Sequence, residues 1–144
     1  MNLRAFADPF AALVREFDLE LVHLKQMLAL AEEEHRTLVA GDIARLDAIS
    51  AEKLVQLHAL ELYTSQRSTY LARQGFTADA SGLAACALAA GGRGRSLTVA
   101  WKRVADALAE LRDLNEENGT LLRARLVELG GPALQAAGLA SLGP

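Results

Sequence analysis

The chain has 144 residues, of which 15 are basic and 18 are acidic, so its formal net charge is −3. This length suits a single domain, and the acidic balance excludes the basic footprint of a nucleic-acid-binding protein. The single cysteine, Cys86, excludes a disulfide framework and a thiolate metal cage. Strand-favouring residues are too few and too scattered to build a sheet, so the composition predicts an all-α protein.

The amino terminus carries charges where a signal peptide needs an apolar core. No stretch approaches the roughly 18 uncharged apolar residues that a membrane-spanning helix requires. We therefore expect a soluble, cytoplasmic protein without membrane insertion.

A first long helix is predicted from Asp8-Pro9, where the aspartate would cap the helix and the proline would occupy its first turn. Apolar residues then recur at steps of three and four, and Gly41 follows as the C-terminal cap. The stripe consists of Phe10, Leu13, Phe17, Leu21, Leu24, Leu28, Ala31, His35 and Leu38.

A second long helix is predicted from an Asp42 cap to Gly75. Two helices of roughly 30 residues with so short a connection must lie antiparallel. Lys53 would then lie beside the end of the first helix and pair with Glu33 or Glu34, and this ion pair would fix the register of the hairpin. The stripe of the second helix consists of Ile43, Leu46, Ser50, Lys53, Leu57, Leu60, Thr64, Arg67 and Leu71.

The glycine-rich segment 76–96 predicts one short helix at about residues 79–90, followed by a mobile loop at 91–95. Ser96 is expected to cap a third long helix, which Gly130-Gly131-Pro132 would stop. Its stripe consists of Leu97, Trp101, Val104, Leu108, Leu111, Asn115, Asn118, Leu122, Arg125 and Leu129.

Three such stripes can bury one another, which predicts an antiparallel helical bundle of three long helices, coiled-coil-like, with one short extra helix. Residues 1–130 would form this bundle, and residues 131–144 would form a flexible apolar C-terminal tail that is too short to fold alone.

Asn115, Asn118 and Gly119 interrupt the third stripe. The two asparagines are either core amides that pair with another helix or amides that receive the backbone of a partner. Both interpretations stay open at this stage, although the spacing favours the first. A missing side chain at Gly119 would let a facing backbone approach closely.

No catalytic, metal-binding or cofactor-binding residues are predicted, and an enzyme is not expected. Glu32-x-x-His35 matches one half of a di-metal motif of helical bundles, but the chain has no second Glu-x-x-His pair. No nucleophile, base and orienting group occur together.

The third helix resembles the signature of the FlgN family of flagellar export chaperones: Trp101, a leucine-rich run, and then Asn115-x-x-Asn118-Gly119-x-Leu121-Leu122. The upstream order of a glutamate at 33–34, Asp42, Lys53, Leu57 and Arg67 is also similar to that family. The resemblance covers about residues 10–130. Its structural signature in this chain consists of Trp101, Asn115, Asn118, Gly119, Lys53 and Arg67.

The resemblance implies a cytoplasmic chaperone of flagellar type III export that masks the terminal helical segments of hook–filament junction proteins. Components of the export apparatus are further candidate partners, and a monomer or weak homodimer is expected. The alternative is a structural or adaptor bundle, an obligate dimer that closes its own seam. Carried over from the family, the client-binding residues are Leu122, Leu126, Leu129, Leu134, Leu139 and Leu142.

Overall fold

The computed structural model describes residues 8–136 of the chain, and the side chains of residues 8–128. Within this part, the elements are all helical, and no strand occurs. They are α2 (Pro9–Ala40), α3 (Ala44–Arg73), α4 (Ala80–Ala89), the 3₁₀ turn η1 (Gly91–Arg93) and α5 (Gly94–Ala136).

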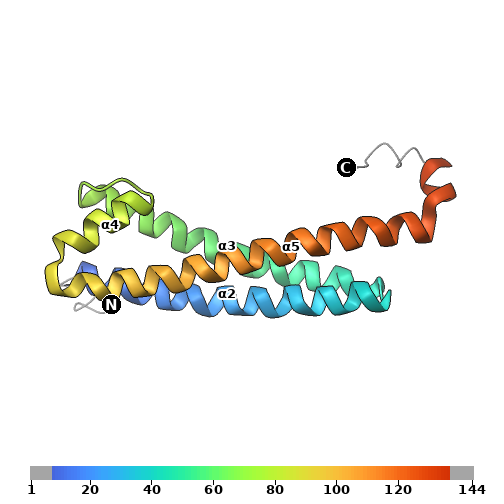
Figure 1. Cartoon of the computed structure of the whole chain (residues 1–144), viewed down its shortest axis with the longest axis horizontal. Helices are drawn as coiled ribbons and strands as arrows, with labels where there is room; N and C mark the ends of the chain where they lie inside the picture. The colour runs from blue at the N-terminus through green and yellow to red at the C-terminus, as the bar shows by residue number, and fades with distance from the viewer. Residues whose placement is uncertain (1–7, 137–144) are drawn as a thin grey trace.

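Three long helices form the antiparallel bundle that the sequence predicts (Figure 1). The helices α2 and α3 form a hairpin, and α5 runs beside α2 in the same direction and so opposite to α3. The helix α2 packs against both of its long neighbours. In the described part of the chain, however, no Cα atom of α3 lies within 8 Å of a Cα atom of α5. One seam of the bundle is therefore open.

The hairpin turn between α2 and α3 depends on the left-handed backbone of Gly41, whose φ is 77°. The amide of Gly41 donates to Leu38 O, and the amide of Asp42 donates to Thr37 O. These bonds satisfy carbonyl groups that the end of a helix leaves unpaired. The predicted capping role of Asp42 is wrong, because Ile43 occupies the N-cap position of α3 and no side chain caps it.

At the other end of the bundle, Asp79 caps α4 by accepting a hydrogen bond from Gly82 N at 2.8 Å. The predicted mobile loop at 91–95 is wrong, since η1 leads directly into α5 at Gly94. A Cβ atom at Gly94 would lie 2.0 Å from Ala87 O, so only glycine permits this close contact between α4 and α5. Ser96 does not cap α5, because the helix already begins at Gly94 and the Ser96 hydroxyl donates a hydrogen bond to Arg93 O.

Arg93 ties this connection to the start of α2. Its guanidinium donates to both carboxylate oxygens of Asp8, at 2.7 and 2.8 Å, and lies 4.8 Å from the ring centroid of Phe10. Asp8 also accepts from Ala11 N as the predicted cap of α2. The hydrogen bond from Arg93, followed by that from Ala11, holds the pKa of Asp8 below its ordinary value.

The core lies where α2 meets its two long neighbours, and it departs from the predicted stripe of α3. Ile49 is fully buried although it lies outside that stripe, whereas Leu57 is 43% exposed and Ser50 and Thr64 are also exposed. The open seam explains these differences, because in the described part of the chain no Cα atom of α5 lies within 8 Å of a Cα atom of α3. The main hydrophobic cluster consists of Leu13, Phe17, Leu24, Met27, Ala31, Leu60, Leu71, Leu83, Cys86, Leu97, Ala100, Val104, Ala107 and Leu111.

The predicted stop of the third helix at Gly130-Gly131-Pro132 is wrong, because α5 continues to Ala136. A helix can pass through such residues at a cost of about 1 kcal/mol per glycine and about 3 kcal/mol for the proline. The ribbon of α5 bends near this end (Figure 1), as expected where a proline removes an amide donor. The division into a bundle of residues 1–130 and a tail of residues 131–144 stays a prediction, and residues 137–144 lie outside the described part. No helix of residues 8–136 is long and apolar enough to cross a membrane.

Candidate helix-binding groove

The open seam between α3 and α5 forms an apolar groove with a floor made by α2. Its volume is about 850 Å³. Leu54, Leu57 and Leu108, on its two walls, are 55%, 43% and 39% exposed. These leucines lie together on one surface rather than singly, which makes the groove a candidate interaction site. The apolar side chains that line the groove are Met27 of α2, Leu54, Leu57 and Leu60 of α3, and Leu108 and Leu111 of α5.

A buried ion pair lies at one end of the groove. Arg67 of α3 donates a hydrogen bond to Glu20 of α2, and their side chains are only 15% and 3% exposed. The guanidinium carbon of Arg67 lies 4.9 Å from the ring centroid of Phe17 and 5.9 Å from that of Trp101. The structure thus brings Arg67 and Trp101 together. Sequence reasoning missed Glu20, although its spacing from Phe17 places it on the buried face of α2.

A second polar cluster lies toward the hairpin end of the groove. Lys53 donates to Glu34 Oε1 at 3.3 Å and to Asn115 Oδ1 at 2.8 Å. This geometry confirms the predicted pair of Lys53 with Glu34. Glu33 pairs instead with Arg45, at 2.8 Å.

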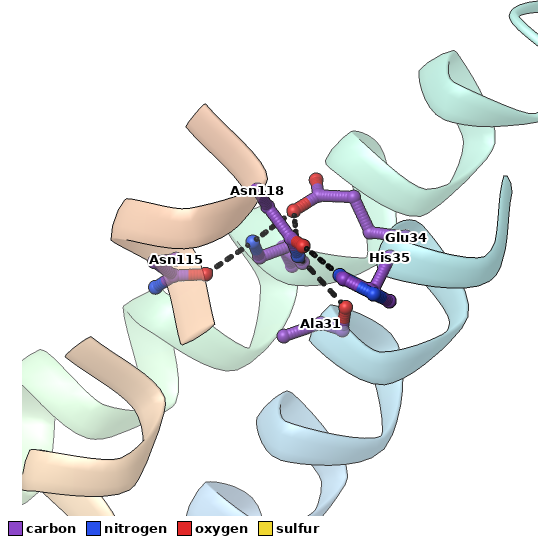
Figure 2. Close-up of polar contacts among 6 residues, drawn as sticks. Ala31, Glu34, His35, Asn115 and Asn118 are labelled. Carbon is purple, nitrogen blue, oxygen red and sulfur yellow. Dashed lines mark hydrogen bonds and ion pairs between the residues drawn. The ribbon is translucent and has the colours of Figure 1, made fainter. Parts of the chain in front are cut away.

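Asn118 is a core amide, as one of the two interpretations of the sequence proposed. It is 2% exposed, and its Nδ2 donates to Ala31 O and to Glu34 Oε1, both at 2.8 Å. Its Oδ1 accepts from His35 Nδ1 at 3.1 Å. Figure 2 shows Asn118 among these three residues of α2. The amide therefore fastens α5 to α2.

Asn115 differs from Asn118, because it is exposed rather than buried as the stripe predicted. Its Oδ1 accepts from Lys53 Nζ, while its Nδ2 has no hydrogen-bond partner among the described residues. Asn115 also lines the groove. It therefore presents an unused donor at the edge of an apolar surface.

The expected close approach of a backbone to Gly119 is wrong. A Cβ atom built there would have a single neighbour within 4 Å among the described residues, a guanidinium nitrogen of Arg123 at 3.6 Å. Gly119 instead lines a small hollow of about 210 Å³ beside Leu122. This hollow and the main groove share four lining residues, which are Glu34, Ser50, Lys53 and Asn115.

Of the predicted client-binding leucines, Leu122 and Leu126 lie on α5 and are 37% and 43% exposed. Arg125, between them, donates to Leu38 O at 2.8 Å and to Val39 O at 2.6 Å. These bonds fasten α5 to the carbonyl groups that end α2, and the later turns of α5 extend past the hairpin (Figure 1). The side chains of Leu129 and Leu134 lie outside the described residues, as do Leu139 and Leu142 altogether.

Among the residues with described side chains, no group of three or more His, Cys, Asp and Glu could hold a metal ion. His35, part of the partial metal motif, instead contacts Asn118. Cys86 is buried, and burial raises the pKa of its thiol, which disfavours the reactive thiolate.

These features define a class of protein: an open helical bundle that presents a groove lined by leucines together with charged and polar residues. Its surface offers the geometry with which proteins receive an amphipathic helix.

The model of the FlgN protein family matches residues 9–130, so the chain belongs to the FlgN family of flagellar synthesis and export chaperones. This match confirms the resemblance seen in the third helix. Among solved structures, the chain is similar in fold to a Pseudomonas aeruginosa protein provisionally identified as a flagella synthesis protein FlgN. The two share 24% identity with a TM-score of 0.71, over 82% of this chain and 92% of that one. No curated protein is significantly similar to the chain.

Proposed function

We propose that this protein is a cytoplasmic chaperone of flagellar type III export that binds the terminal helical segments of hook–filament junction proteins and masks them before export. Membership of the FlgN family over residues 9–130 is the observation that carries the proposal. Masking the client segment prevents self-association, because an amphipathic helix without a partner binds to other helices of the same type.

The C-terminal part of α5 supports this role. Leu122, Leu126 and Val127 are 37%, 43% and 68% exposed on a helix that Arg125 holds firmly against α2. A helix with exposed leucines can receive the apolar face of a client helix. Ordering a client segment costs several kcal/mol of the interaction energy, which favours a moderate and reversible affinity. Reversible binding suits a carrier that must release its client.

The test is co-purification with the hook–filament junction proteins encoded by the same genome. The parent chain should retain them, and the double variant Leu122→Asp/Leu126→Asp should bind about tenfold more weakly or not at all. Leu88→Asp is a matched control, because Leu88 is 85% exposed on α4. Deletion of residues 131–144 should also abolish co-purification and leave the melting temperature nearly unchanged. Failure of the parent chain to retain any junction protein would refute the proposal.

The second candidate is a structural or adaptor bundle, an obligate dimer in which a second copy covers the apolar residues of the open seam between α3 and α5. Light scattering over a range of protein concentrations separates the two candidates. A monomer or weak dimer supports the chaperone, whereas a dimer that persists on dilution supports the adaptor.

A further inference from the structure

The leucines of the C-terminal part of α5 and the groove form one continuous surface. The hollow beside Leu122 and the main groove share Lys53 and Asn115 among their lining residues. Along α5, Leu108, Asn115 and Leu122 recur every seven residues and therefore face nearly the same direction. A helix that lies on Leu122 and continues toward the start of α5 must enter the groove.

We propose that the groove between α3 and α5 is a docking site for the client helix and that Asn115 sets its register; this inference rests on the proposed function. The docked helix completes a four-helix bundle by covering the open seam. Its contact from Leu108 to Leu126 spans about 27 Å at 1.5 Å per residue. The client segment therefore needs at least about 18 helical residues.

The chemistry of the groove also specifies the pattern of the occupant. Leucines on both walls demand an apolar stripe at heptad spacing. In the middle of the contact, Asn115 Nδ2 has no partner among the described residues, and Lys53 lies beside it. Burying that donor without an acceptor is costly. The apolar stripe of the client must therefore carry one accepting side chain, such as Asn, Gln, Asp or Glu. This residue should lie about seven residues from the client's apolar residues that contact Leu108 and about seven from those that contact Leu122.

The geometry favours a client over a second copy of this chain. The groove is concave, and two concave surfaces cannot fill each other. In the part of the chain with described side chains, the stripes of α2 and α5 are largely occupied by mutual packing. A second copy that inserted the end of its α5 would have to use the leucines that are assigned to the client.

The test measures binding of the purified junction proteins to the full chain by isothermal titration calorimetry. Leu57→Glu, inside the groove, should weaken binding by about tenfold or more. Leu62→Glu is the matched control, because Leu62 lies on the same helix, is 58% exposed and does not line the groove. The control should bind within about twofold of the parent. Circular dichroism melting must show that both variants fold.

Two further measurements locate the occupant and its register. A benzoylphenylalanine crosslinker at position 57 should capture the client, while one at Leu88 should not. Asn115→Leu should weaken binding, and replacing the accepting residue of the client by leucine should restore it. Absence of this rescue would overturn the role of Asn115.

The outcomes separate this inference from the proposed function. If the parent chain binds junction proteins and Leu57→Glu binds them equally well, the groove is not the docking site, and the proposed function stands. If the parent binds no junction protein, both proposals are overturned. If Leu57→Glu instead converts a dimer of the free chain into a monomer, a second copy occupies the groove, and the inference is wrong.

Discussion

Two polar clusters connect the long helices, and their side chains differ in exposure to solvent. In the first, the side chains of Glu20 and Arg67 are 3% and 15% exposed beneath Phe17 and Trp101. In the second, the side chains of Glu34 and Lys53 are 17% and 19% exposed, and the neighbouring Asn115 is open to solvent. Both clusters line the groove, and they differ most in one member of each, because the Glu20 carboxylate is buried whereas Asn115 is exposed.

The comparison shows that the role of a polar side chain depends on how deeply it is buried. A buried pair has lost its water, so each charge depends on the other. In the second cluster, Asn115 is exposed and keeps water as an alternative partner, which it can exchange for a ligand at little cost. We therefore assign a structural role to Glu20 and Arg67, whereas the recognition role proposed above concerns Asn115.

The largest expected effect is at the first cluster. Arg67→Ala should lower the free energy of unfolding by about 3–5 kcal/mol, because it leaves the buried carboxylate of Glu20 uncompensated. The double variant Glu20→Met/Arg67→Met should recover most of this loss. Chemical denaturation measures both. An Arg67→Ala variant as stable as the parent would show that Glu20 is not buried as described.

The second-largest loss of stability is expected for a substitution at Asn118. Asn118→Ala should cost about 1–3 kcal/mol, since it removes the donor to Ala31 O and Glu34 and leaves the groups around it unpaired. Urea denaturation gives the value. A loss below about 0.5 kcal/mol, within the range of ordinary surface substitutions, would contradict the assignment of Asn118 to the core.

Gly119→Ala should have a smaller effect of opposite sign. Because a Cβ atom there meets only Arg123, at an ordinary contact distance, helix propensity should raise the stability by about 1 kcal/mol. The melting temperature should rise accordingly. A fall would show that a neighbour approaches Gly119 more closely than the structure indicates.

Asn115→Ala should have the smallest effect on stability, about 0.5 kcal/mol or less, because Lys53, its partner among the described residues, retains Glu34 and water. The same variant should nevertheless weaken client binding. A thermal melt paired with calorimetry measures the two effects. A loss of stability as large as that of Asn118→Ala would show that Asn115, like Asn118, has a structural role.

Local signals in the sequence predicted most of the helix boundaries. Asp8-Pro9 and Gly41 delimit α2, because capping depends on residues within one turn of a helix end. Strong periodicity likewise predicted the three long helices. The pair of Glu34 with Lys53 was predictable because a short turn leaves little freedom in the register of a hairpin.

Only the tertiary structure decided which face of each helix is covered. Periodicity shows which residues share a face, but burial depends on where the neighbouring helix lies. Because α3 and α5 stand apart, Leu57 and Asn115 are exposed although their spacing matches a core stripe. Glu20 lies on the buried face of α2, but its partner Arg67 is 47 residues away on another helix, so no local signal in the sequence identifies this ion pair.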